Sequence, residues 1–256
     1  MKKVVVIGTG KVATHLTKAL VNADCQVVQI VGRSYDSIKR MQQEMGIVLP
    51  FTWDKNQVQQ DADLYICSVK DDAIQDALTG IQIPPHALLV HTSGSVHSQV
   101  LAPYATHYGV LYPMQTFSYG KEVDFSKVAL YIEANSNKQE QRLLLFANKL
   151  SSNIKVVDSA MRAKVHLAAV FACNFTNHLY ALAEKILSEV NLPFSDLLPL
   201  VDETTEKIHT LSPRKAQTGP AIRGDKQIIE KQLAALNGRE KDIYQLLTES
   251  IQDDKF

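Results

Sequence analysis

The residues most able to do chemistry in this sequence are histidines and amides at helical spacing in its second half. His166, Asn174 and His178 follow one another at multiples of four residues, and Asn177 falls close to the same line. Residues four apart share one face of an α-helix, so this spacing predicts a polar face with two imidazoles and two amides. An imidazole exchanges protons near neutral pH, and an amide orients a substrate by hydrogen bonds. We interpret His166 as a proton donor, Asn174 as a catalytic positioning residue and Asn177 as a substrate contact. A polar face that bonds to a neighbouring helix is the alternative.

A glycine-rich turn near the N-terminus has the spacing of a dinucleotide-binding loop. The turn is Gly8-Thr9-Gly10-Lys11-Val12-Ala13, and it follows the apolar run 3–7. In such a loop the first glycine allows a sharp turn, and the second lets the backbone approach a pyrophosphate. The small third residue lets the next helix pack closely, with its free N–H groups facing the phosphates. We interpret residues 8–13 as cofactor-binding; an ordinary strand-turn-helix corner is the alternative.

The residues after the second expected strand indicate which dinucleotide binds. An NAD-binding unit usually has an acidic residue there, roughly 20 residues beyond the glycines, which holds the ribose 2′-hydroxyl. This chain has no acid at positions 30–34 and carries Arg33 and Ser34 instead. A guanidinium and a hydroxyl suit a 2′-phosphate, which favours NADP over NAD as the cofactor. The alternative is that Arg33 is a solvated loop residue and Asp36 caps the next helix.

Two further expected strands end in polar residues. Ser68 and Val69 end one of them, and His91 ends the next before a polar loop that contains Ser93 and Ser95. Ligands of parallel α/β sheets bind outside the carboxyl ends of the strands. We therefore expect Ser68, Val69 and His91 to line the cofactor site and Ser93 to contact the substrate. A core role for His91 and a helix-capping role for Ser95 are the alternatives.

A constrained loop near the C-terminus carries another candidate. The pair Gly219-Pro220 opens the loop, and Arg223 and Asp225 flank Gly224. Such a loop lets backbone approach another group closely. We interpret Arg223 as a substrate-binding residue for a carboxylate. Pairing with Asp225 or with a neighbouring subunit is the alternative.

The elements that must position these residues alternate between strand and helix up to about residue 158. Short apolar runs predict strands, and segments with helical periodicity separate them. The expected strands are 3–7, 26–31, 63–69, 87–91, 110–117, 128–133 and 154–157. This order predicts an α/β fold with a doubly wound, mostly parallel Rossmann sheet over residues 1–158.

From residue 159 onward the expected elements are all helical. Residues 160–190 contain almost no turn formers and carry apolar residues at helical spacing, which predicts one long helix. Prolines then punctuate further helices, the last over about 239–252. We expect residues 159–256 to form a helical domain for substrate contacts and for a homodimer surface, since its apolar residues need a partner layer.

Composition limits the classes of partner. The 27 lysines and arginines equal the 27 aspartates and glutamates, so the net charge gives no support to nucleic acid or an anionic membrane. No apolar stretch approaches the roughly 20 residues that span a bilayer, and the N-terminus lacks the parts of a signal peptide. Three widely spaced cysteines form neither a metal nor a disulfide pattern. We expect a cytoplasmic protein without a metal site.

Several of these segments together resemble a bacterial Rossmann-like family. The segments that carry the resemblance are 8–13, 32–34, 91–95, 112–117, 166–174 and 218–225. The family is classified as a domain of unknown function and is related to pyrroline-5-carboxylate reductases and deazaflavin-dependent NADP oxidoreductases. The resemblance implies an NADP-binding Rossmann domain and a C-terminal domain similar to that of 6-phosphogluconate dehydrogenase, usually in a homodimer. Related β-hydroxyacid dehydrogenases carry a lysine four residues before a helix asparagine. Here Val170 takes that place before Asn174, which makes His166 the substitute to test.

Together these features predict an NADP(H)-dependent oxidoreductase that acts by hydride transfer on a small imine or carbonyl compound. Two other classes stay open. One is a non-catalytic NADP(H)-binding redox sensor that reports to a partner. The other is a transferase or lyase that uses a different nucleotide, such as a nucleotide sugar.

Overall fold

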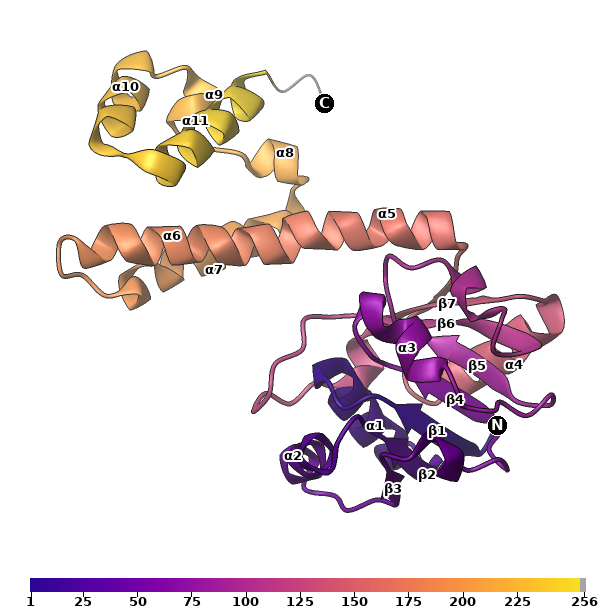
Figure 1. Cartoon of the computed structure of the whole chain (residues 1–256). Coiled ribbons are helices and arrows are strands. Elements are labelled where there is room, and N and C mark those ends of the chain that lie inside the picture. The colour runs from indigo at the N-terminus through magenta and orange to yellow at the C-terminus, as the bar shows by residue number, and fades with distance from the viewer. Residues whose placement is uncertain (254–256) are drawn as a thin grey trace. The chain divides into compact units, whose positions relative to one another are not determined.

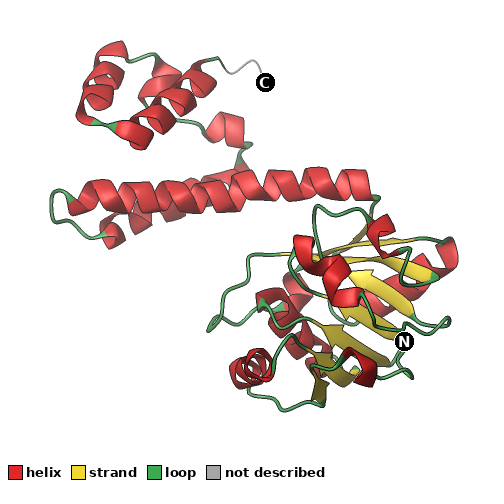
Figure 2. Cartoon of the chain, in the orientation of Figure 1, coloured by secondary structure: helices red, strands yellow, loops and turns green. Residues whose placement is uncertain are grey.

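A computed structural model describes residues 1–253, which divide into two compact units (Figure 1). The first unit ends at Asn174 and the second begins at Phe175. All strands of the described residues lie in the first unit, and the second is helical (Figure 2). The predicted α/β fold followed by a helical region is confirmed. The first unit also includes the helix that begins at Ser159, which we had assigned to the second domain.

The sheet of the first unit has eight strands in the order β3-β2-β1-β4-β5-β6-β7-β8. Neighbouring strands are parallel, except that β6 and β7 are antiparallel. The strand order reverses at β1, which is the switch point where sheets of this kind bind ligands. The strands are β1 Lys3–Ile7, β2 Gln26–Val31, β3 Phe51–Thr52, β4 Leu64–Cys67, β5 Leu88–His91, β6 His107–Met114, β7 Ala129–Ala134 and β8 Ile154–Val156. The doubly wound, mostly parallel sheet is as predicted.

Two strands differ from the prediction. The strand β3 was not expected, because a run of two residues shows no periodicity. The strand expected over 110–117 ends at Met114, since its pairing partner β7 begins opposite it at Ala129. Residues beyond Met114 therefore have no strand to pair with and leave the sheet.

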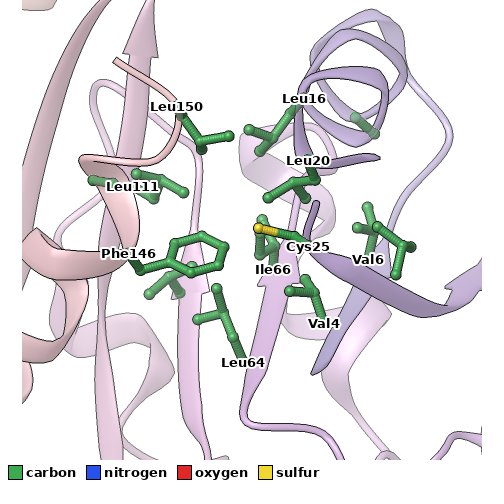
Figure 3. Packing of buried hydrophobic residues seen from close by; sticks show 14 of the residues in the cluster. Val4, Val6, Leu16, Leu20, Cys25, Leu64, Ile66, Leu111, Phe146 and Leu150 are labelled. Carbon is green, nitrogen blue, oxygen red and sulfur yellow. The ribbon is translucent and has the colours of Figure 1, made fainter. Parts of the chain in front are cut away.

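Helices cover both faces of the sheet and bury Val4, Val5, Val6 and Ile7 of β1. The helices of this unit are α1 Lys11–Asn22, α2 Tyr35–Met45, α3 Ile74–Leu78, α4 Asn137–Ala147 and α5 Ser159–Ala169, with 3₁₀ turns η1 Lys55–Gln57, η2 Asp71–Ala73, η3 Ser98–Leu101 and η4 Phe125–Lys127. Val4 and Val6 pack in the core with α1, α2 and α4, whereas Val5 and Ile7 pack in the core with α3. Figure 3 shows the first of these cores, with Phe146 of α4 pointing into it. This alternation holds the carboxyl end of β1 rigidly.

The long helix predicted over 160–190 is present but contains a π-helical segment. The helix α5 passes without interruption into the π-helical segment Val170–Phe175 and then into α6 Thr176–Ser188 (Figure 1). A π-turn closes i to i+5 hydrogen bonds, so residues after it leave the register of those before it. The predicted polar face from His166 to His178 crosses this segment and stays a prediction.

The second unit consists of helices with many exposed apolar side chains. After α6 come η6 Phe194–Leu197, α7 Leu198–Thr210, α8 Pro213–Ala216, α9 Pro220–Arg223, α10 Lys226–Ala235 and α11 Gly238–Gln252. Leu179, Ile186, Leu200 and Leu246 are among its exposed apolar residues. The homodimer expected from the sequence stays a prediction. Within residues 1–253, no helix has both the length and the apolar character needed to cross a membrane.

Candidate functional site

The glycine-rich turn joins β1 to α1 at the carboxyl edge of the sheet. Gly8 has a φ of +125°, and a Cβ there would lie 2.1 Å from the carbonyl oxygen of Ser68. By contrast, a Cβ on Gly10, the N-cap of α1, would meet no atom within 4 Å. The protein's own packing thus requires glycine at position 8. The space beside Gly10 is open to a ligand.

The remaining residues of the turn leave the start of α1 accessible to an anion. Ala13 is fully buried, which brings α1 close to the sheet, whereas Thr9, Lys11 and Val12 keep exposed surface. The first turn of α1 contains no acidic residue, so no carboxylate neutralises its N–H groups and positive dipole end. The Lys11 Nζ lies 5.7 Å from the ring centroid of Tyr119. A phosphate fits this arrangement.

The loop after β2 places Arg33 and Ser34 as predicted, with one correction. Both residues are exposed at the carboxyl end of β2. Ser34 caps α2, since its hydroxyl accepts the N–H of Ser37 at 3.4 Å and the Ser37 hydroxyl accepts the N–H of Ser34. Asp36 lies in the first turn and is not the cap. The capping role considered for Asp36 was therefore wrong. The Ser34 hydroxyl already accepts a hydrogen bond from the first turn of α2.

The residues after β4 lie directly against the glycine-rich turn. A Cβ on Gly8 would lie 3.2 Å from Cγ1 of Val69. Ser68 is buried, and its hydroxyl oxygen accepts a hydrogen bond from the hydroxyl of Thr92 at 3.0 Å. The structure therefore brings Ser68 and Val69 together with Gly8. Their contact with a cofactor stays a prediction.

His91 ends β5 with no exposed surface. Its Nδ1 accepts the backbone N–H of Ser93 at 3.1 Å, so the neutral ring carries its proton on Nε2. Among the described residues this Nε2 has no hydrogen-bond partner. Burial, together with the charge of Arg162, lowers the pKa of His91 to about 4. His91 is thus a neutral core histidine, and its complete burial argues against the predicted cofactor contact.

The loop after β5 is held by its own serines. The Ser93 hydroxyl oxygen accepts the N–H groups of Ser95 and Val96, at 3.1 and 3.0 Å. The Ser95 hydroxyl donates to the carboxylate of Asp71 at 2.5 Å, and His97 rather than Ser95 caps η3. The capping role considered for Ser95 was therefore wrong. The Ser93 and Ser95 hydroxyl oxygens also lie 3.4 Å apart, so the bonds of Ser93 shape the loop, and its contact with a substrate stays a prediction.

The helix α5 places His166 between this loop and the end of β6. The Nδ1 atom of His166 lies 3.0 Å from the hydroxyl oxygen of Tyr112, and the two rings meet edge-on. A Cβ on Gly94 would lie 2.5 Å from the same Nδ1, so the backbone at Gly94 packs directly on the imidazole. Burial raises the pKa of Tyr112, which keeps the phenol protonated at neutral pH. When Tyr112 donates to Nδ1, the neutral imidazole keeps its own proton on Nε2.

One helical turn before this histidine, Arg162 fixes α5 to the sheet. Its side chain has no exposed surface, pairs with Glu133 of β7 and donates to the carbonyl of Val96. Glu133 also accepts hydrogen bonds from Ser98 at 2.6 Å and from Ser159 at 2.7 Å. Burial alone would raise the pKa of Glu133, but the hydrogen bonds from these serines and the arginine lower it overall. The carboxylate therefore stays charged beside Arg162.

Tyr112, Arg162 and Glu133 were not predicted as site residues from their spacing in the sequence. Arg162 carried a signal, because it lies four residues before His166 and so extends the same helix face. Tyr112 and Glu133 lie on expected strands, but no spacing in the sequence shows that β6 and β7 pair antiparallel. Nothing in the spacing shows that α5 reaches both strands either.

The other predicted residues lie on the π-helical segment and in the second unit. Asn174 is exposed on the π-helical segment, and Asn177 is exposed on α6. Arg223 ends α9 and pairs with Asp225 at 2.8 Å, which confirms one of the alternatives given for it. Roles of these residues toward a substrate stay predictions. Within residues 1–253, no group of three or more histidines, cysteines and acids is placed to hold a metal.

Two family models match this chain. Residues 3–94 match the family described as NADP oxidoreductase, coenzyme F420-dependent. Residues 128–251 match a domain of unknown function, DUF2520. No curated protein matches the sequence.

Solved structures extend these matches over nearly the whole chain. A proposed NADP oxidoreductase from Bacteroides fragilis is 43% identical with a TM-score of 0.92, and the match covers 98% of each chain. A 1-pyrroline-5-carboxylate reductase from Streptococcus pyogenes is 15% identical with a TM-score of 0.66, over 98% of each chain. An imine reductase from Myxococcus stipitatus, in complex with NADP⁺, is 14% identical with a TM-score of 0.63, over 98% of this chain and 92% of that one. At 15% and 14% identity, the likeness to the last two structures shows a shared fold only.

The fold and the glycine-rich turn define a Rossmann-like α/β protein with a helical C-terminal region. Within that class, the chain belongs to the Rossmann-like family that carries the DUF2520 domain of unknown function. That family is related to NADP oxidoreductases and pyrroline-5-carboxylate reductases. The resemblance drawn from the sequence is confirmed.

Proposed function

We propose that this protein is an NADP(H)-dependent oxidoreductase that reduces a small imine or carbonyl compound. The observation that carries the proposal is the hydrogen-bonded pair of His166 and Tyr112 at the carboxyl edge of the sheet. The open turn at Gly10 lies at the same edge. Reduction of a C=N or C=O bond needs a hydride and a proton, and a histidine beside a dinucleotide-binding loop is suited to give the proton. The likeness to an NADP oxidoreductase and to imine reductases supports the same class.

In this proposal, different residues of the first unit bind the cofactor and deliver the proton. The turn 8–13 and the N-terminus of α1 hold the pyrophosphate, and Arg33 holds the 2′-phosphate. Bound there, NADPH supplies the hydride that the substrate carbon accepts. Protonated His166 delivers a proton from Nε2 to the substrate nitrogen or oxygen and is left as a neutral imidazole, so the products are an amine or alcohol and NADP⁺. Tyr112 holds the ring, because its hydroxyl oxygen accepts the Nδ1–H of the charged imidazole.

The cofactor assignment is tested by titrating the protein with NADPH and NADH. We expect Arg33→Ala to weaken NADPH binding by about 10- to 150-fold, because hydrogen bonds to charged groups contribute roughly 1.5–3 kcal/mol. NADH affinity stays unchanged, since NADH has no 2′-phosphate. Lys138→Ala, which removes an exposed cation from α4, is the matched control. A wild-type protein that binds neither nucleotide would overturn the proposal.

Substitutions of the two glycines of the turn should affect different properties: one lowers stability and the other weakens cofactor binding. Gly8→Ala is expected to lower the free energy of unfolding by roughly 3 kcal/mol or more, since it combines a positive φ with a backbone collision. Gly10→Ala is expected to cost only about 1 kcal/mol at this N-cap. It should nevertheless weaken NADPH binding at least about tenfold, because its methyl group fills the space meant for the pyrophosphate. Thermal unfolding and cofactor titration measure the two effects. Full NADPH affinity in Gly10→Ala would contradict this role.

A further inference from the structure

Three aromatic side chains gather on the surface beside the end of β2. Tyr35, Phe51 and Trp53, the aromatic trio, are 49%, 37% and 55% exposed. Their ring centroids lie 5.9–6.0 Å apart, with Phe51 and Trp53 stacked and Tyr35 edge-on to Trp53. Large aromatic rings left open to water in one cluster mark a binding surface more often than a packing accident.

The backbone holds the aromatic trio in place. The short strand β3 pairs with β2 through Phe51, opposite Ile30, and through Thr52. Thr52 is buried, so the alternation along the strand turns Phe51 to the opposite, exposed side, and Trp53, directly after the strand, stacks on it. Tyr35 begins α2 and meets them from another part of the sequence. The trio is therefore a formed surface rather than three loose side chains.

The aromatic trio adjoins the loop proposed to hold the 2′-phosphate. The N–H of Gly32 donates to the carbonyl of Thr52 at 3.0 Å, which ties the loop of Arg33 to the strand before Trp53. A Cβ on Gly32 would lie 3.1 Å from the Thr9 methyl, so the glycine-rich turn continues into this loop. The Lys39 Nζ lies 6.0 Å from the Tyr35 ring centroid and adds a second exposed cation. One continuous surface thus offers a phosphate cradle, cations and aromatic rings.

We infer that the aromatic trio is the stacking platform for the adenine ring of NADP(H), with Trp53 as its main contact. The inference rests on the proposed function and adds the residues that bind the adenine end. A purine offers a flat π face to such rings, and the neighbouring Arg33 matches the 2′-phosphate on the same adenosine. The platform therefore fixes the adenine end, whereas Arg33 selects between the two dinucleotides.

Because the two contacts differ in this way, the NADPH and NADH affinities of variants test the platform. Adenine is common to NADPH and NADH, so Trp53→Ala should weaken both by the same factor, roughly 5- to 150-fold from the usual strength of base stacking. Arg33→Ala should weaken NADPH alone. Trp53→Phe keeps an aromatic face and should retain most of the affinity. Leu145→Ala removes an exposed apolar side chain from α4 and should change neither affinity.

The wild-type protein offers a second test, because Trp53 is its only tryptophan. Adenosine 2′,5′-bisphosphate, which lacks the nicotinamide, should quench the tryptophan fluorescence. Nicotinamide mononucleotide, which lacks the adenine, should leave the fluorescence unchanged.

Unchanged NADPH and NADH affinities in Trp53→Ala would overturn the platform. The aromatic trio would then be assigned to a protein contact, and the proposed function would still stand. A selective loss of NADPH would also overturn the platform, by placing Trp53 at the 2′-phosphate. A wild type that binds no NADPH removes both proposals.

Discussion

Replacing His166 with alanine should lower turnover roughly 10²- to 10⁴-fold while NADPH binds with nearly unchanged affinity. The imidazole is held by Tyr112 and by the backbone at Gly94, at the edge where the proposed reduction takes place. Its removal takes away the proton donor and leaves Gly10 and Arg33 untouched. Single-turnover measurement of NADPH oxidation, with cofactor affinity measured in parallel, separates the two effects.

Two further variants make the test specific. Tyr112→Phe removes only the hydroxyl that bonds Nδ1, so we expect a smaller loss, up to about tenfold. Lys164→Ala changes an exposed residue of the same helix off the His166 face and should leave turnover intact. Unaltered turnover in His166→Ala would exclude this residue from the chemistry. If the wild type binds NADPH but oxidises it with no imine, ketone or hydroxyacid, the redox-sensor interpretation replaces the catalytic one.

Local patterns in the sequence were sufficient to predict the sheet and the glycine-rich turn at its carboxyl edge. Val4 to Ile7 form an unbroken apolar run, and such a run fits a strand that is buried on both faces. The glycines that follow fix the turn through short-range geometry, and Gly8 shows why, since its φ excludes most other residues. Features that depend on a few neighbouring residues can be read in this way.

The parts that could not be predicted depend on distant residues meeting in space. The link from His166 to Tyr112 requires the order of β5, β6 and β7, which spacing does not encode. The π-helical segment shifts the helix register without any proline or glycine to signal it. Trp53 attracted no interpretation because Tyr35, which completes the aromatic trio, comes from another element. In each case the missing information was tertiary contact rather than residue type.

Arg162→Ala should lower the free energy of unfolding by about 3–5 kcal/mol at neutral pH. The substitution leaves the Glu133 carboxylate, only 16% exposed, without its cationic partner, and breaking one side of a buried pair costs about that much. It also loosens α5 one turn before His166, so turnover should fall as well. Urea unfolding followed by circular dichroism measures the stability. Lys18→Ala, which breaks the exposed pair with Glu122, is the control and should change stability little.

The pH dependence gives this pair a signature that simple loss of packing would not. The pKa of Glu133 is lower in the folded protein than its ordinary value, so folding favours the charged carboxylate. Its contribution to stability is therefore fully present above the unfolded pKa, near 4.3, and is lost as the pH falls through the lower folded pKa. Glu133→Gln should consequently be less stable than wild type at pH 7, and the difference should shrink on acidification below about pH 4. A difference that stays constant over this range would mean that Glu133 acts through packing, and that the charge of Arg162 does not hold α5 in place.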